Sequence, residues 1–529
     1  MKILQVLSEC YPLIKTGGLA DYGFSLPHKI QQLGADVRVL LPGYGDVLES
    51  VGVGKIVGEF EIGLAGVQRH VTVIEVLPEE FEMPVWLVVC PALFERPGNP
   101  YLDTDGVDWP DNAERFALFS KVAAMLATGQ NSERWRADVV HCHDWQTGLV
   151  PAWLKREPGP PVSVFTIHNL AYNGVFPHSE FQRLELPAEW WHAEGVEFYD
   201  SICMLKAGIV FADAVTTVSR TYAKEILTPE FGCGMEGVLQ IYRDKLSGIL
   251  NGIDAHIWNP VDDPYLVRHY SIEDRAAGSA ANREALFRLL DWQPGESAAT
   301  VPLFGSVGRL VDQKGIDLLV SAASRILDHH AASFVIIGDG QHEYIEQLME
   351  LQHTYPEQVR VFIGYSEELA HLLEAAADFF VMPSRYEPCG LNQLYSLRYG
   401  TVPVVHHVGG LADTVVDATP ENLDNGTATG VVFYEANEES LHTALLRAIE
   451  LFNDTVHWQQ VQVAGMHTDF GWLNSARQYM VLYAETSGQA APLEGEMQVT
   501  QTERLAVAAR SGASGKRAKA AVNLRKTRD

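Results

Sequence analysis

The sequence predicts an α/β protein with two domains, each built on a parallel β-sheet covered by helices. First, a chain of 529 residues is longer than a single hydrophobic core usually serves, which favours two or more domains. Second, short apolar runs alternate with longer helical patterns, and this alternation is typical of βαβ units. Third, the alternation stops once, between about residues 251 and 297, and then begins again.

Short continuous apolar runs in the first half predict buried parallel strands, because strands covered on both faces show no polar alternation. These runs are residues 2–8, 35–42, 85–91, 137–144, 162–169 and 214–219. Helical patterns separate some of them, at residues 111–127, 147–157 and 204–212. Together they predict a first Rossmann-like domain over residues 1–255.

The second half repeats the pattern and predicts a second Rossmann-like domain over residues 256–468, with a hinge near residue 255. Its predicted strands are residues 301–310, 333–340, 359–365, 378–384 and 401–407, and its clearest helices are 315–330 and 369–377. An amphipathic helix within residues 469–488 is expected to cross back to the first domain. If the two sheets face each other, the cleft between them is the expected binding site.

Charge and composition exclude several classes of protein. The net charge of −29 combines +7 over residues 504–529 with −36 elsewhere, and an acidic body argues against nucleic acid as a main partner. No apolar run of 18 residues and no signal-peptide pattern are present, so we expect a cytoplasmic protein without a membrane partner. The six cysteines are scattered without a CxxC pair, which predicts neither a disulfide framework nor structural zinc.

Residues 489–529 are expected to form a disordered basic tail, since they are rich in Ala, Ser, Gly and basic residues. Contact with RNA, with a membrane or with the acidic body remains open, as does a tail without any dedicated partner. The sequence does not predict an oligomeric state.

The loop KTGGLAD follows the first predicted strand and has the features of an anion-binding loop. Gly17 and Gly18 allow close approach of a ligand, the amides at a following helix start favour an anion, and Lys15 adds a positive charge. Neither the Walker pattern GxxxxGK[ST] nor the dinucleotide pattern GxGxxG occurs.

Two further strands of the first half end in polar residues. The run HCHDW, residues 141–145, has the composition of a metal site, but no third and fourth ligands are evident, so structural or substrate-binding roles are favoured. Asp144 is expected to hold sugar hydroxyls, and Trp145 to stack on a sugar ring. His168 and Asn169 end the next strand, and for His168 a structural and a functional role are equally open. Asn251 stands at the hinge, in NGID.

In the second half, Arg309 and Lys314 follow a predicted strand and suit a diphosphate, because a planar fork and a point charge complement each other. Two fixed cations would stabilise a departing diphosphate without a divalent metal. We therefore expect no metal and no other cofactor. Glu387 precedes a helix start and is expected to hold sugar hydroxyls or offset positive charge, while Cys389 is expected to be a small buried residue.

The letters GGLAD occur again at residues 409–413. No lysine stands near this second copy, so it is expected to be a strand-to-helix turn that positions the loop containing Glu387. Asp413→Asn is accordingly expected to affect mainly stability.

Taken together, these motifs resemble the bacterial glycogen synthase and starch synthase family over about residues 1–485. The motifs, in chain order, are KTGGLAD, HCHDW, FTIHN, NGID, GRLVDQKG, EPCGLNQLYSLRYGT and VGGLADTV. The resemblance implies two facing Rossmann-like domains of the GT-B type with a cleft between them. It also implies retaining transfer of glucose from ADP-glucose to the non-reducing end of an α-1,4-glucan such as glycogen.

The resemblance also implies roles for single residues. Lys15 and Gly18 match the family's donor and acceptor loop, Asp21 its helix-start acid, Tyr101 a sugar-site tyrosine, and His168 the residue near the glucose C6 hydroxyl. Arg309 and Lys314 match the diphosphate clamp, Glu387 the essential carboxylate, Cys389, Gly390 and Leu391 glucose and phosphate contacts, and Tyr365 the ring that stacks on adenine. The chain departs from the family pattern at Tyr22, where a small β-branched residue is usual. It also departs at Asn392, where Thr is common; we expect Asn392 to cap the helix and bind phosphate.

Other interpretations remain open at this point. UDP-glucose is an alternative donor, because uracil also stacks on an aromatic ring. A glucan-binding protein without turnover and a nicotinamide-dependent dehydrogenase are alternatives of other classes, although the second lacks GxGxxG. Retention through a covalent intermediate is less favoured than same-face attack, in which the departing phosphate deprotonates the acceptor.

Overall fold

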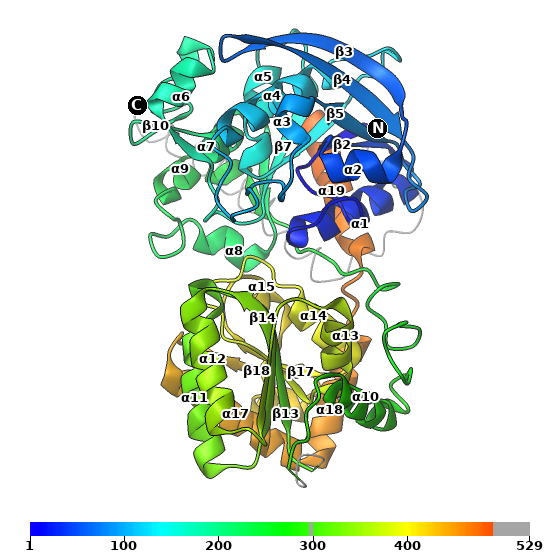
Figure 1. Ribbon diagram of the computed structural model, residues 1–529, viewed down its shortest axis with the longest axis vertical. Helices are drawn as coiled ribbons and strands as arrows, with labels where there is room; N and C mark the ends of the chain where they lie inside the picture. Colours follow the sequence, from blue (N-terminus) through cyan, green and yellow to red (C-terminus); the bar gives the residue numbers. More distant parts are fainter. Residues whose placement is uncertain (296–299, 490–529) are drawn as a thin grey trace, which may run out of the picture. The chain divides into compact units, whose positions relative to one another are not determined.

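The computed structural model describes residues 1–295 and 300–489, and the chain from residue 1 to 489 forms one compact unit (Figure 1). This unit contains a nine-stranded sheet, a six-stranded sheet and a small three-stranded sheet. The predicted α/β class is therefore confirmed, with one largely parallel sheet and one entirely parallel sheet. The predicted tail, apart from Gln489, lies outside the described residues.

The first sheet has the strand order β12-β11-β7-β6-β1-β2-β5-β4-β3. Its strands are β1 (Lys2–Val6), β2 (Asp36–Pro42), β3 (Lys55–Leu64), β4 (Val67–Val76), β5 (Val85–Val89), β6 (Val139–His143), β7 (Val162–Ile167), β11 (Ala214–Thr217) and β12 (Leu246–Gly248). All six predicted strands are present and pair in parallel, whereas β3 and β4 form an antiparallel hairpin at the edge. The hairpin was not predicted, because its residues alternate between exposed and buried positions.

Helices cover both faces of this sheet (Figure 1). They are α1 (Gly18–Gln32), α2 (Gly45–Val51), α3 (Pro91–Phe94), α4 (Asn112–Ala127), α5 (Leu149–Leu154), α6 (His178–Arg183), α7 (Met204–Phe211), α8 (Arg220–Glu225) and α9 (Glu236–Ile241). The small sheet consists of β8 (Val175–Pro177), β9 (Glu197–Phe198) and β10 (Ser201–Cys203).

The second sheet is entirely parallel, with the strand order β15-β14-β13-β16-β17-β18. Its strands are β13 (Leu303–Leu310), β14 (Ser333–Gly340), β15 (Val359–Ile363), β16 (Phe379–Met382), β17 (Val402–His406) and β18 (Val431–Phe433). Its helices are α10 (Arg275–Leu289), α11 (Ile316–His329), α12 (His342–Thr354), α13 (Glu367–Ala376), α14 (Asn392–Tyr399), α15 (Gly409–Thr414), α16 (Pro420–Asp424), α17 (Glu438–Asn453) and α18 (Thr455–His467). All five strands predicted for this half are present.

The chain passes between the two halves twice, and the two crossings lie side by side. Ile253 forms a parallel bridge with Gly471, and its N–H donates to the carbonyl of Phe470 (2.9 Å). The last helix, α19 (Trp472–Ser487), then packs against α1, and Trp472 and Tyr479 belong to the core of the first half. The C-terminal helix thus completes the N-terminal core.

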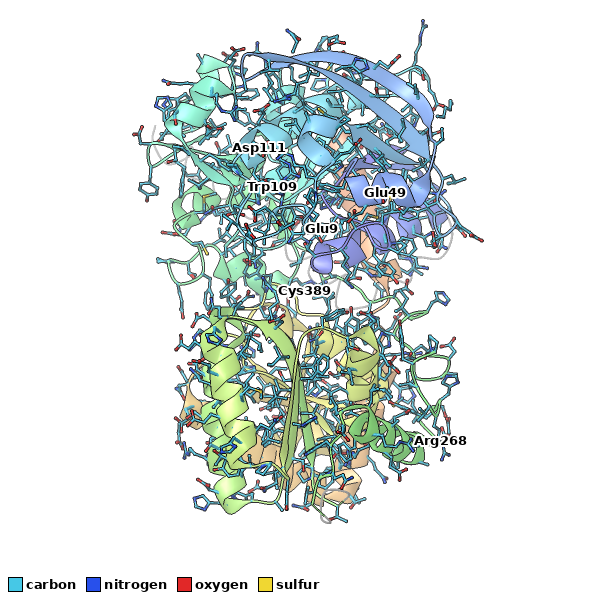
Figure 2. All side chains as sticks on the ribbon, viewed as in Figure 1. Glu9, Glu49, Trp109, Asp111, Arg268 and Cys389 are labelled. Carbon is cyan, nitrogen blue, oxygen red and sulfur yellow. The ribbon has the colours of Figure 1, made fainter. Side chains whose placement is uncertain are left out.

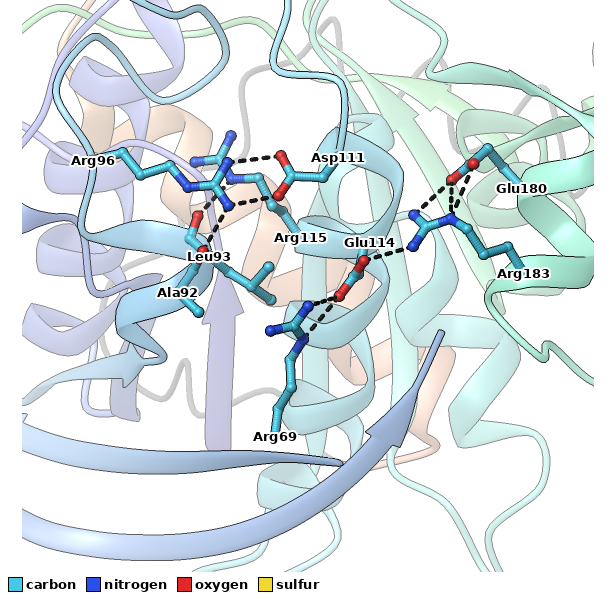
Figure 3. Close-up of polar contacts among 9 residues, drawn as sticks. All are labelled: Arg69, Ala92, Leu93, Arg96, Asp111, Glu114, Arg115, Glu180 and Arg183. Atoms are coloured by element: carbon cyan, nitrogen blue, oxygen red, sulfur yellow. Dashed lines mark hydrogen bonds and ion pairs between the residues drawn. The ribbon is translucent and has the colours of Figure 1, made fainter. Parts of the chain in front are cut away.

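Ion pairs around the buried Glu114 and around Asp111 hold the hairpin and the long loop before α4 (Figure 3). Glu114 of α4 is 5% exposed and accepts hydrogen bonds from Arg69 of β4 (2.8 Å) and Arg183 of α6 (2.7 Å). Arg96 forms a bidentate pair with Asp111 at 2.6 and 2.8 Å. Because removal of both arginines would leave the buried Glu114 charge unpaired, its ion pairs hold β4, α4 and α6 in one arrangement.

Within the described ranges, no helix has both the length and the apolar character needed to cross a bilayer. All six cysteines are free thiols.

Candidate active site

Among the parallel strands of each large sheet there is one place where the chain order reverses, and the predicted site residues lie at the ends of the strands at these places. In the first sheet β1 lies between β2 and β6, and in the second sheet β13 lies between β14 and β16. A parallel sheet opens a crevice at the carboxyl ends of such neighbouring strands, and ligands bind there. The KTGGLAD loop and Asp144 follow β1 and β6. Arg309 lies near the carboxyl end of β13, Lys314 follows that strand, and Glu387 follows β16.

The KTGGLAD loop is held by Glu9, the acidic residue that directly follows β1 (Figure 2). One oxygen of Glu9 accepts hydrogen bonds from the backbone N–H groups of Thr16 (2.5 Å) and Gly17 (3.0 Å). The other accepts from the hydroxyl of Tyr101 (2.6 Å). Glu9 is 3% exposed, so a buried carboxylate sets the loop's conformation. This role was not predicted, although an acidic residue shortly after the first strand indicates a functional position.

Tyr101 is held from behind by the start of α4. Asn112 donates to the carbonyl of Tyr101 (3.0 Å), and Arg115 donates to the carbonyl of Pro100 (2.9 Å). Arg115 is 1% exposed, and burial lowers its pKa. The buried guanidinium therefore stabilises the loop that contains Tyr101. Through the hydrogen bond of Tyr101 it also helps to fix the position of Glu9.

Lys15 and Asp21 form an ion pair of 2.9 Å at the N-terminus of α1. Burial raises the pKa of Asp21, and the ammonium of Lys15 opposes this shift. Lys15 lines a different cavity from Arg309 and Lys314. The predicted loop lysine is thus not brought together with the two predicted diphosphate cations.

The histidines of HCHDW are engaged within the first core. His141 forms hydrogen bonds with the Tyr483 hydroxyl and the Thr166 hydroxyl, both of 2.6 Å. His143 bonds to Gln5 (3.0 Å) and to His168 (3.1 Å). Both ring nitrogens of each histidine therefore have partners. Among the residues that the structure describes, no group of three or more His, Cys, Asp and Glu has metal-binding geometry.

Asp144 stands in a costly conformation at the end of β6. Its backbone angles are φ 56° and ψ −176°, in a region that is essentially restricted to glycine. Its carboxylate accepts from the N–H of His168 (2.7 Å). Burial raises the pKa of Asp144 to about 7, with the N–H groups of His168 and Asn169 opposing the shift. A strained and desolvated acid at a strand end is typical of a functional position.

His168 is partly exposed, and burial lowers its pKa to about 3. Its imidazole is therefore neutral near pH 7. Asn169, also partly exposed, uses its side-chain oxygen to accept from the N–H of Ala171 (3.1 Å). Trp145 is only 9% exposed and packs against Phe116. The expectation that Trp145 stacks on a sugar ring is wrong, because its rings belong to the core.

In the second half, Lys314 donates to Glu387 (2.5 Å), and the Ser384 hydroxyl donates to the same oxygen (3.0 Å). Glu387 is 6% exposed. Arg309 donates to the hydroxyl of Tyr172 from the first half (2.9 Å). Arg309, Lys314, Ser384 and Asn392 line one cavity. The structure therefore brings the predicted cation pair beside the predicted carboxylate.

Asn392 does not cap α14 as expected. It is the first residue of the helix, after Leu391 at the N-cap, and its amide donates to the carbonyl of Val307 (2.8 Å). The amide thus ties the helix start to β13. Burial raises the pKa of the Cys389 thiol to about 12, so this residue is a neutral thiol at physiological pH.

The two motif loops approach each other at Gly18 and Leu391. A Cβ atom on Gly18 would lie 3.5 Å from the side chain of Leu391. Gly390 has a φ of +73°, which an L-residue adopts only with strain.

Asn251 is 7% exposed, and its side-chain oxygen has no hydrogen-bond partner in the described parts of the chain. Tyr365 is 68% exposed, and its hydroxyl contacts Glu367.

The second GGLAD copy supports the loop that carries Glu387. A Cβ on Gly409 would lie 1.9 Å from the carbonyl oxygen of Glu387, and one on Gly410 would lie 2.0 Å from that of Cys389. The N–H of Gly410 donates to the carbonyl of Glu387 (3.0 Å). Only glycine fits at these two positions, so this copy is a packing element of the site.

The same copy also joins the two halves through a reciprocal pair of helix caps. Asp413 accepts from the N–H groups of Arg220 (2.6 Å) and Thr221 (2.9 Å), which begin α8. Glu225, at the end of α8, accepts from the N–H of Gly409 (3.0 Å), which begins α15. Carboxylates thus meet the N-terminal amides of both helices.

Two family models, which together match most of the chain, show that it is a glycosyltransferase. A starch synthase catalytic domain matches residues 2–241, and a group 1 glycosyl transferase domain matches residues 292–460.

The sequence of Hydrogenovibrio crunogenus glycogen synthase is 51% identical over 487 residues, which cover 91% of this chain and 99% of that protein. Glycogen synthase 1 of Methylococcus capsulatus is 48% identical over 92% of this chain and 96% of its own length. The chain belongs to the glycogen synthase and starch synthase family.

Solved structures agree with this assignment. The catalytic domain of starch synthase IV from Arabidopsis thaliana, bound to ADP and acarbose, superposes with a TM-score of 0.80 at 31% identity. The match covers 92% of this chain and 99% of that one. A sucrose-phosphate synthase from Thermosynechococcus elongatus, at 18% identity and a TM-score of 0.54, shares the fold.

Proposed function

We propose that this protein is a glycogen synthase that transfers glucose from ADP-glucose to the non-reducing end of an α-1,4-glucan, with retention at the anomeric carbon. The observation that carries the proposal is the contact of Glu387 with Lys314, which lines one cavity together with Arg309. The relatives named glycogen synthase and the ADP-bound plant starch synthase support the same donor and acceptor.

Arg309 and Lys314 supply the electrostatic part of the reaction. As the bond between the glucose C1 and the phosphate oxygen breaks, negative charge grows on the diphosphate. Cations fixed at this place stabilise the transition state more than the ground state. In the present structure Glu387 already neutralises Lys314, so an arriving diphosphate competes with Glu387 for the ammonium. Loss of that contact leaves the carboxylate free to face the sugar.

Asp144 and His168 supply hydrogen bonds to the sugar. The neutral imidazole of His168 both accepts and donates, which suits a hydroxyl group. Attack by the acceptor hydroxyl on the same face as the departing diphosphate retains the configuration. Its proton passes to the diphosphate, so the protein contributes mainly positioning. Cys389 is not a nucleophile in this scheme, because its thiol holds its proton near pH 7.

The test is incorporation of labelled glucose into glycogen from ADP-glucose, with UDP-glucose as the parallel donor. We expect label in the polymer, release by an α-1,4-specific amylase, and a clear preference for ADP-glucose. We also expect activity to survive EDTA, since no metal is part of the proposed mechanism. No transfer from either donor would leave a glucan-binding protein without turnover, and a preference for UDP-glucose would replace the donor.

A further inference from the structure

A second cavity lies beside the crossings between the two halves, apart from the cavity that contains Arg309 and Lys314. Its lining combines three carboxylates, those of Asp21, Asp254 and Glu367, with the ammonium of Lys15 and with aromatic rings such as Trp258 and Tyr395. This balance disfavours a phosphate group and favours a ligand that donates hydrogen bonds and has an apolar face.

Glu367 is the acidic residue that the second half contributes to this cavity. It is the first residue of α13, where a carboxylate is stabilised by the free amides of the helix start. One of its oxygens contacts the hydroxyl of Tyr365. The other lies 3.6 Å from Nε2 of His371, one helical turn further along. Glu367 thus stands between an exposed tyrosine and a buried histidine.

His371 is fully buried and held on every side. Its Nδ1 bonds to Asp263 (2.7 Å), which is also fully buried and accepts from the Tyr399 hydroxyl (2.5 Å). The indole of Trp258 lies parallel to the imidazole at 3.7 Å, and Tyr395 stacks on the other face of that indole at 3.7 Å. The imidazole therefore has one orientation, with Nε2 directed to Glu367.

Nε2 of His371 has no hydrogen-bond partner within residues 1–295 and 300–489, although it is buried. Burial opposes the charged form of His371, but the carboxylates of Asp263 and Glu367 outweigh it and raise the pKa. A buried N–H donor without a hydrogen bond is costly. A small inward movement of Glu367 would satisfy it, so the pair is suited to fix this carboxylate when a ligand fills the cavity.

The place of Glu367 relative to the second sheet indicates which part of a sugar-nucleotide donor this cavity would bind. Tyr365 and Glu367 follow β15, and β15 is separated from β13 by one strand. Adjacent strands lie about 4.8 Å apart, so the ends of β15 and β13 are roughly 10 Å apart. A nucleoside diphosphate whose phosphates lie at Arg309 and Lys314 reaches this far with its nucleoside.

We propose that Glu367 binds the nucleoside of the sugar-nucleotide donor, and that the buried His371–Asp263 pair positions it. The inference rests on the proposed function and names a further donor-binding residue for it. The carboxylate accepts hydrogen bonds from the nucleoside, whose donors are the ribose hydroxyls and an exocyclic amino group. Fixing the acceptor in advance reduces the entropy that binding must overcome.

The test measures dissociation constants for ADP by calorimetry and inhibition constants for pyrophosphate, with the full-length protein. E367Q is expected to raise the Kd for ADP by about five- to tenfold and to leave pyrophosphate inhibition and the glucan KM unchanged. H371N retains an amide donor for Asp263 but lacks Nε2, and it is expected to weaken ADP binding similarly. The double variant is expected to be no weaker than E367Q, because both changes remove one interaction.

Nucleotide analogues identify the hydrogen-bond donor. With 2′-deoxy-ADP the penalty of E367Q disappears if the ribose 2′-hydroxyl is the partner, and with inosine diphosphate it disappears if the amino group is. H342N is the matched control. His342 and Glu346 form a similar pair one turn apart (3.2 Å), but on the surface of α12, and no binding constant is expected to change.

Three results overturn the inference. The first is unchanged ADP binding by E367Q in a wild-type protein that binds ADP. The second is a raised glucan KM instead, which would assign the cavity to the acceptor. The third is an equal loss of ADP and pyrophosphate affinity in H371N and in H371Q, which would make His371 purely structural. A wild-type protein that binds no ADP at all would instead refute the proposed function.

Discussion

Asp144→Asn is expected to stabilise the protein while it damages the activity. Burial raises the pKa of Asp144 from 3.8 to about 7, so the folded state binds this proton more tightly than the unfolded state. The free energy of unfolding therefore falls as the pH rises from about 4 to 7. Each unit of pKa corresponds to about 1.4 kcal/mol. The cost of ionising Asp144 is thus up to about 1.7 kcal/mol at pH 5 and about 4 kcal/mol at pH 8.

Asparagine avoids this cost, since it cannot ionise and its side-chain oxygen still accepts from the N–H of His168. The melting temperature of D144N is expected to exceed that of the wild type, by a margin that grows between pH 5 and pH 8. Calorimetric scans at four pH values measure the margin. Glucose incorporation is expected to fall at least about tenfold in the same variant, because a charged acceptor is lost.

D213N is the control, because the pKa of Asp213 is shifted in the opposite direction and the opposite change in stability is expected. Burial acts to raise the pKa of Asp213, but hydrogen bonds from Lys155 and Ser163 outweigh it and lower the pKa. The stability that Asp213 contributes is therefore present at neutral pH and is lost as the pH falls, so D213N is expected to be less stable than the wild type at pH 7. A D144N margin that is negative at pH 8, or independent of pH, would refute the reasoning.

Four further predictions concern single contacts. R309A is expected to lose at least about a hundredfold in kcat with an unchanged melting temperature; near-normal turnover would refute the clamp. E9Q removes the negative charge and replaces one carboxylate oxygen by an NH2 donor, so either the loop amides or the Tyr101 hydroxyl loses its acceptor. The kcat/KM is expected to fall about tenfold, and unchanged kinetics would contradict the anchoring role. D413N weakens the cap of α8 and is expected to cost about 1 kcal/mol of stability with little change in kcat, whereas a loss of kcat at unchanged stability would point to a ligand contact. G410A is expected to unfold or misplace the loop before α14, while G17A, with open space at its Cβ position, is expected to fold normally; circular dichroism and thermal scans decide, and a well-folded G410A would contradict the packing role.

Sequence patterns predicted the elements of this fold because buried parallel strands carry a continuous apolar signal. Residues 162–169, for example, contain β7 in full. The edge hairpin lacks this signal, since β3 faces solvent along one side. Its two strands are held instead by pairing with each other and by buried charges such as Glu114, whose partners stand 45 and 69 positions away.

The same difference explains which site residues were predictable. Residues at the carboxyl end of a buried strand, such as Asp144 and Arg309, could be proposed from their place alone. Glu9 also has such a place, but its role depends on Tyr101, 92 positions later. The contact between His371 and Asp263 spans 108 positions. No local pattern carries contacts of this kind, because they form only when the two sheets and their loops are assembled.

The two GGLAD copies show how little the letters alone determine. In the first copy, a Cβ on Gly17 would meet no atom within 4 Å, and one on Gly18 would meet only a side chain at 3.5 Å. In the second copy, the corresponding positions of Gly409 and Gly410 are blocked by backbone carbonyls at 1.9 and 2.0 Å. Glycine therefore leaves room for a ligand in the first copy and for the neighbouring loop in the second. Since that loop carries Glu387, the second copy shapes the site without facing the substrate.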